Sequence, residues 1–131
     1  MRALLLVACL FLMTGCDEAQ TSPTAPVDAE FTLAPGEGRR IEGESVSVTF
    51  VGVSGDSRCP ADAICVWGGS ATVKITVASG FSSQGYELQT GDMRPVVHNG
   101  LTIALVELSP YPFSARPIAP DEYRATLKVT R

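Results

Sequence analysis

From about position 30 onward, hydrophobic and polar residues alternate along most of the chain. Alternation with a period of two is typical of a β-strand with one buried face. The clearest example is the segment 71–77, where every second residue is apolar and the residues between are Thr72, Lys74 and Thr76. The same pattern predicts further strands around 31–33, 39–43, 45–53, 86–88, 101–108 and 123–129. We therefore expect an all-β domain over residues 30–131, a single antiparallel β-sandwich or small barrel of about seven to eight strands.

Two local signals refine this prediction. Asn99-Gly100 separates the short apolar segments 96–98 and 101–103, and this dipeptide favours a tight hairpin turn because both residues tolerate positive φ. We expect His98, next to this turn, to be an exposed hairpin residue. The apolar positions change parity between Phe50 and Val51, so we predict a β-bulge there, since one extra residue exchanges the two faces of a strand.

The first residues follow a different pattern. Arg2 is followed by an uninterrupted apolar run from Ala3 to Met13. A helix needs roughly 20 apolar residues to cross a bilayer, so this run is too short to span one. A run of this length behind a positive charge is instead typical of a secretory signal peptide.

Met13-Thr14-Gly15-Cys16 resembles the lipobox of bacterial lipoproteins. The resemblance implies that the Cys16 thiol receives a diacylglyceryl group, that residues 1–15 are removed as the signal peptide, and that the protein is lipid-anchored in the bacterial cell envelope. In enteric bacteria an Asp after the lipidated Cys, as at Asp17, is associated with the inner membrane; the choice between the periplasmic faces of the inner and outer membranes stays open. The alternative is an ordinary secretory signal with an incidental Cys16.

Residues 16–29 contain no aromatic and almost no large apolar residue, which predicts a flexible tether behind the lipid. Without Arg2 the mature chain has nine Lys and Arg against fourteen Asp and Glu, a formal charge of about −5. Nucleic-acid binding requires a basic face, so this charge argues against it. Attraction to anionic lipid headgroups is equally disfavoured, so we expect the acyl chains to do the anchoring.

Of the four cysteines, Cys9 lies in the signal peptide and Cys16 in the lipobox. The remaining pair, Cys59 and Cys65, is expected to form a disulfide, because exported compartments are oxidising. One histidine and a bridged cysteine pair cannot form a tetrahedral zinc site. We therefore predict no metal, no cofactor and no catalytic residue.

The segment 55–69 is the least generic part of the domain, since it contains the expected disulfide and the only tryptophan. A loop restricted by a disulfide and a proline loses little entropy on binding, so it is our first candidate for a binding surface. Trp67 is either an interface anchor or, as the small core favours, a plug over the end of the sandwich. The candidate binding residues of this loop are Arg58, Pro60, Ile64 and Trp67.

Two sharper hypotheses concern the same loop. A protease inhibitor could present Arg58 or Ile64 to a protease, with Arg58 suited to a trypsin-like pocket. Gly55-Asp56-Ser57 also resembles the nucleophile block of one esterase family, which implies a hydrolase using Ser57. That mechanism needs a histidine base, and His98 is the only histidine in the chain.

A second unusual segment, 109–120, carries four prolines and two aromatic residues, so it is expected to be a crossover loop between the last two strands. Tyr111 and Phe113 either fold back onto the core, which we favour, or form a second candidate partner surface. The sequence as a whole predicts a membrane-anchored envelope lipoprotein whose β domain binds or scaffolds an envelope protein or another ligand. We do not expect an enzyme.

Overall fold

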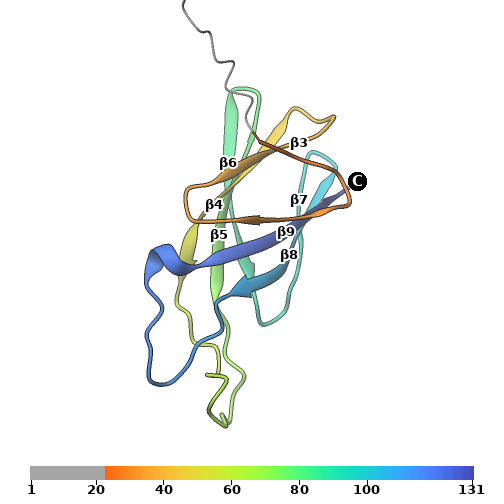
Figure 1. Cartoon of the computed structure of the whole chain (residues 1–131). Helices are drawn as coiled ribbons and strands as arrows, with labels where there is room; N and C mark the ends of the chain where they lie inside the picture. Colours follow the sequence, from red (N-terminus) through yellow and green to blue (C-terminus); the bar gives the residue numbers. More distant parts are fainter. Residues whose placement is uncertain (1–22) are drawn as a thin grey trace, which may run out of the picture.

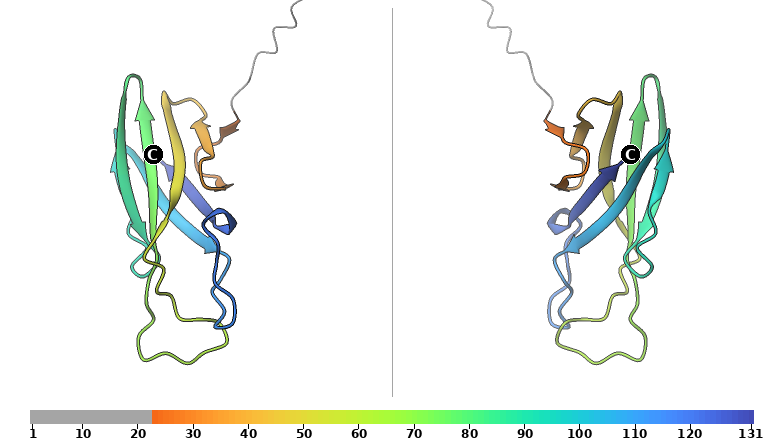
Figure 2. Two further views of the ribbon diagram at one scale, coloured as in Figure 1. Left: turned by 90° about the vertical axis from the view of Figure 1, so that its left-hand side faces the viewer. Right: turned by 90° about the vertical axis from the view of Figure 1, so that its right-hand side faces the viewer.

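The structure is a computed structural model that describes residues 23–131. These residues form two β-sheets packed face to face, and the prediction of an all-β sandwich is confirmed (Figures 1 and 2). The expected signal peptide, lipobox and lipidated Cys16 lie outside the described residues. Within 23–131 there is no α-helix, only one 3₁₀ turn, η1 (Pro120–Glu122).

Nine strands make up the two layers. The first sheet has the order β1 (Thr24–Ala25), β3 (Gly38–Ile41), β4 (Val46–Ser54), β5 (Thr72–Ser79) and β6 (Ser82–Gln89). The second sheet has the order β2 (Glu30–Leu33), β9 (Arg124–Thr130), β8 (Leu101–Ser109) and β7 (Val96–His98). All pairs are antiparallel except β1 with β3, which are parallel.

The core lies between the sheets and is built from the alternating residues that the sequence pattern selects. Phe50 of β4 is its largest fully buried side chain. The same core cluster contains aliphatic residues from both layers, including Val48, Val73, Ile75, Leu88, Ile103, Leu127 and Val129. Removing this apolar surface from water, at about 25 cal/mol per Å², is the main force that holds the layers together.

Both local signals of the sequence are confirmed. The β4–β5 register shifts between Phe50 and Gly52, so the bulge is where the parity changes. Asn99 and Gly100 have φ values of 49° and 80°, as a two-residue hairpin turn with positive φ at both positions requires.

The domain begins earlier than the sequence predicts. Thr24 and Ala25 pair with Arg40 and Ile41 of β3, and Ala25 is buried. The backbone N–H of Asp28 also donates to the carbonyl of Val129. The prediction of a tether over 16–29 is therefore wrong for residues 23–29, because a two-residue strand of small side chains has no periodicity that could reveal it.

The register defines the two ends of the sandwich. At one end Val46 pairs with Ser79, beside the β5–β6 turn; at the other Ser54 pairs with Thr72, beside the long β4–β5 loop. We call the first end the hairpin pole, since the β5–β6 and β7–β8 turns meet there. The second end is the loop pole, formed by the loops 55–71 and 110–119 and by the turn 90–95. Figures 1 and 2 show the two poles at opposite ends of the molecule.

Candidate binding site at the loop pole

The β4–β5 loop, which contains no β-strand, extends beyond the end of the sheet at the loop pole. Cys59 and Cys65 form the predicted disulfide, with their Cα atoms 5.9 Å apart. The stem below it is closed by two backbone hydrogen bonds, from Ser57 N to Ser70 O (2.8 Å) and from Cys59 N to Gly68 O (3.1 Å). The loop is thus fixed at its base and again near its tip.

Gly69 allows the two sides of this stem to approach. Its φ is +64°, and a Cβ at this position would overlap the carbonyl oxygen of Ser57. Only glycine combines this backbone conformation with the absence of a side chain. Gly69 therefore sets how close the returning chain runs to the outgoing one.

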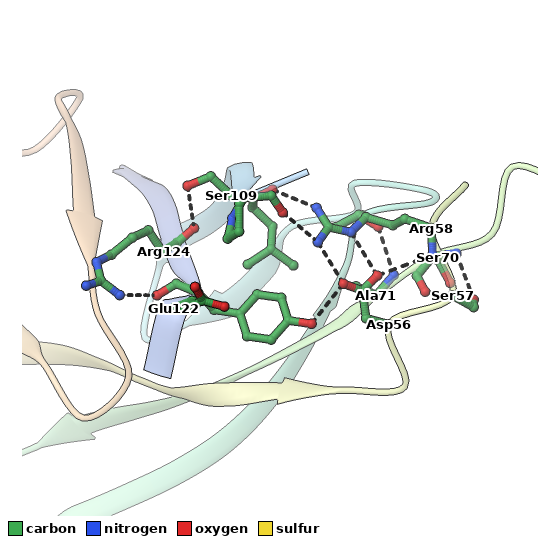
Figure 3. A network of polar contacts seen from close by, with 12 residues as sticks. Asp56, Ser57, Arg58, Ser70, Ala71, Ser109, Glu122 and Arg124 are labelled. Carbon is green, nitrogen blue, oxygen red and sulfur yellow. Dashed lines mark hydrogen bonds and ion pairs between the residues drawn. The ribbon is translucent and has the colours of Figure 1, made fainter. Parts of the chain in front are cut away.

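Arg58 does not point toward solvent but lies under the loop, 8% exposed. Its guanidinium forms a bidentate pair with Asp56, at 2.9 Å from Nε and 2.7 Å from Nη2 (Figure 3). It also donates to the carbonyls of Leu108 (2.7 Å) and Pro110 (3.0 Å). Arg58 therefore joins the loop of the first sheet to the end of β8 in the second sheet. It does not project into solvent as a side chain presented to a protease would, and it holds the two loops of this pole together.

Tyr123, the residue immediately before β9, completes this network. Its hydroxyl donates to Asp56 Oδ2 at 2.9 Å, so this carboxylate accepts hydrogen bonds both from Arg58 of the β4–β5 loop and from Tyr123 beside β9. Burial disfavours the charged carboxylate, but the bonds from Arg58 and Tyr123 outweigh it and lower the pKa of Asp56 below its usual value. The hydrogen bond to Asp56 raises the pKa of Arg58. The pKa of Tyr123 is also raised, mainly by burial of its hydroxyl and secondly by the hydrogen bond to Asp56.

Beyond this network, farther from the sheets, the β4–β5 loop exposes apolar side chains to solvent. Trp67 is 83% exposed, and Ile64 and Val66 are more exposed still. The expectation that Trp67 plugs the core is wrong. The end of the sandwich is instead covered by the buried side chains of Arg58 and Tyr123, which are each 8% exposed. Pro60 is half-buried and lies within the ring that the disulfide closes.

The β8–β9 loop forms the other side of the pole. Tyr111 and Phe113 are 60% and 55% exposed, so they do not fold onto the core as expected. The Tyr111 ring instead lies against the Arg58 guanidinium, 5.4 Å from its centroid, in a cation–π contact. The two loops are also joined directly, since Ala61 N donates to Pro112 O (2.8 Å) and Ser114 donates to Asp62 through its N–H (2.9 Å) and hydroxyl (3.1 Å).

A cleft of about 410 Å³ opens beside the disulfide. It runs between the β4–β5 loop, the turn 90–95 and the outer face of β8, and its lining includes Cys59, Met93, Val106, Glu107 and Tyr111. Val66 lies within the predicted candidate segment 55–69, although it is not among the candidate residues named for that segment. Met93 is not predicted as part of this pole, because nothing in the local sequence pattern marks it.

The structure does not bring together the residues of the hydrolase hypothesis. Ser57 Oγ donates to the carbonyl of Ser70 at the loop pole (2.9 Å). His98 lies at the hairpin pole, where its ring nitrogens contact Ser79 Oγ (3.1 Å) and Tyr86 Oη (2.9 Å). The Ser57–His98 pair is therefore not formed, and the expectation of an exposed His98 is also wrong, because its place in β7 turns it inward.

His98 connects the two sheets, since Ser79 and Tyr86 belong to β5 and β6. We expect His98→Ala to lower the free energy of unfolding by about 1–3 kcal/mol, because both hydrogen bonds are lost and their partners lie partly buried. Urea unfolding measures this loss. Val97→Ala, at the adjacent outward-facing position, is the control and should change stability by less than about 0.5 kcal/mol. Equal effects of the two substitutions would contradict the role of His98.

Within residues 23–131, no group of three or more His, Cys, Asp and Glu side chains is placed to hold a metal ion. None of the elements in the described part of the chain is a helix long and apolar enough to cross a membrane. No protein-family model, no curated protein and no solved structure matches the chain.

Proposed function

We propose that this protein is a membrane-anchored bacterial envelope lipoprotein whose β-sandwich binds a partner protein through the loop pole. The observation that carries the proposal is the exposure of Ile64, Val66 and Trp67 on a loop that is tied by a disulfide. Large apolar side chains held together in water are typical of protein-interaction surfaces. The lipobox-like sequence before Cys16 supports the membrane anchor.

The way the loop is held supports binding energetically. The disulfide, the stem hydrogen bonds and the contacts to Pro112 and Ser114 restrict the loop before any partner arrives. A pre-organised surface loses little conformational entropy on association, so more of the contact energy appears as affinity. Trp67 is the expected anchor, because tryptophan is enriched among interface residues whose truncation costs most.

The proposal predicts that Trp67→Ala removes the partner while the domain stays folded. In intact cells, chemical cross-linking followed by purification of the protein should yield a specific adduct with wild type. Loss of an anchor costs about 2 kcal/mol or more, which is roughly a 30-fold weaker complex. The matched control is Phe81→Ala, which removes another fully exposed aromatic residue at the hairpin pole and should keep the adduct. An adduct that survives Trp67→Ala but not Phe81→Ala would contradict binding at the loop pole.

A second candidate is a protease inhibitor that presents Ile64. The specific observation in its favour is that Ile64 is fully exposed next to the disulfide, whereas Arg58 is buried. Purified protein added to a panel of proteases should then inhibit one that accepts an aliphatic residue, and Ile64→Asp should abolish the inhibition. Absence of inhibition throughout the panel would remove this candidate and leave the binding module.

A further inference from the structure

We infer that the loop pole is the membrane-distal end of the anchored protein, and that it meets from the aqueous side a protein with an apolar pocket bordered by basic side chains. The inference rests on the lipid anchor of the proposed function. It adds the direction from which the partner comes and the chemistry of the partner's surface.

The point at which the chain joins the sandwich sets this orientation. Thr24 of β1 pairs with Arg40, which pairs with Ser47 near the beginning of β4. Ser47 pairs with Ala78, one residue before the end of β5. The chain therefore joins the fold near the hairpin pole, at the opposite end of the molecule from the disulfide loop (Figures 1 and 2).

The length of chain between Cys16 and Thr24 decides whether the domain could turn its loop pole toward the membrane. From Cys16 to Thr24 there are eight residue steps, which span at most about 28 Å. The seven steps of β5 from Thr72 to Ser79 already cover about 23 Å, and the loop adds further length beyond the strand. Bringing the loop pole to the membrane would therefore use nearly the whole reach of the segment between Cys16 and Thr24, whereas the hairpin pole lies close to the point where that segment joins the fold.

The charges at the loop pole also disfavour a lipid surface. Arg58, Arg94 and Arg116 each pair with a carboxylate, and Arg124 donates to the carbonyls of Asp121 and Tyr123. The carboxylates of this pole outnumber these arginines, and they are Asp56, Asp62, Asp92, Glu107, Asp121 and Glu122. A surface with surplus negative charge is repelled by anionic headgroups.

The same charges describe the partner. The backbone N–H and the hydroxyl of Ser114 lower the pKa of Asp62, so its carboxylate stays charged beside the apolar tip. Glu107 is exposed in the cleft wall. A complementary surface therefore offers an apolar pocket for Trp67 with lysine or arginine side chains around it.

Energy transfer to a labelled membrane tests the orientation, because Trp67 is the only tryptophan of the chain. The lipoprotein is reconstituted into vesicles of phosphatidylethanolamine and phosphatidylglycerol that contain a dansyl-labelled lipid. In the matched variant Trp67→Phe/Phe81→Trp, the donor moves to the exposed tip of the β5–β6 turn at the hairpin pole. Transfer to dansyl should be clearly greater from position 81 than from position 67. Equal or greater transfer from Trp67 would overturn the inference.

Two controls separate this result from the proposed function. A protein that does not float with vesicles would contradict the lipid anchor. Coupling the Cys16 thiol to a maleimide phospholipid would then restore the attachment, so that the orientation is still measured.

The basic border of the partner's pocket is tested by Glu107→Gln, which should lower the yield of the cross-linked partner. Glu42→Gln at the hairpin pole is the control and should leave the yield unchanged. Equal yields from wild type and Glu107→Gln would overturn the basic border.

Discussion

Asp56→Asn is expected to lower the free energy of unfolding by about 3 kcal/mol, because removing one partner of a buried ion pair leaves the other charge uncompensated. The side chains of Arg58 and Asp56 are 6% and 12% exposed. In the variant, Arg58 keeps its bonds to Leu108 and Pro110 but loses its counter-charge. For a domain of this size the expected decrease in Tm is roughly 12–20 °C.

The same pair predicts how stability depends on pH. The folded-state pKa of Asp56 is lowered, so its stabilising effect is fully present above the ordinary carboxyl value of 3.8. It is lost as the pH falls through the lowered folded-state value. Wild type should therefore lose stability toward the variant's level in acid, and the variant should lack this component of the pH dependence.

Thermal unfolding followed by circular dichroism at pH 7 and at a series of acidic pH values measures both effects. Asp121→Asn is the matched control, because Asp121 is an exposed carboxylate of the same pole. It should change stability by no more than about 0.5 kcal/mol. If Asp56→Asn and Asp121→Asn behaved alike at pH 7, the network would not be what holds the two loops together.

Cys16→Ala is expected to move the protein from the membrane fraction to the soluble fraction. Two or three acyl chains give stable membrane attachment, and without Cys16 there is no thiol at the position that would carry them. The mature chain, with a formal charge of about −5, has no electrostatic attraction to replace them.

Fractionation of cells with detection of the protein measures this redistribution. A Cys59→Ser/Cys65→Ser variant is the control, since it also removes cysteines but keeps the lipobox-like segment and should remain with the membranes. Continued sedimentation of Cys16→Ala with membranes would show that something other than lipid holds the protein. Retention of the uncleaved signal segment is distinguished by the mass of the protein.

The sequence by itself determined most of the sheet structure. Alternation at positions such as Val73, Ile75 and Val77 allows only one face to be buried, so strand positions and their inward faces follow directly from it. The parity change at Phe50 located the bulge, and Asn99-Gly100 located a turn, because both signals are local. The pairing of Cys59 with Cys65 followed from the small number of cysteines left for the domain.

Only the tertiary structure decided which residues of the loop pole face the solvent. A loop has no period that distinguishes its two sides, so the sequence could not show that Arg58 lies inside and Trp67 outside. That outcome depends on Leu108, Pro110 and Tyr123, which are distant in the chain and supply the hydrogen-bond partners that burial of Arg58 and Asp56 requires. β1 was hidden for a related reason, because a pair of residues becomes a strand only when β3 lies beside it.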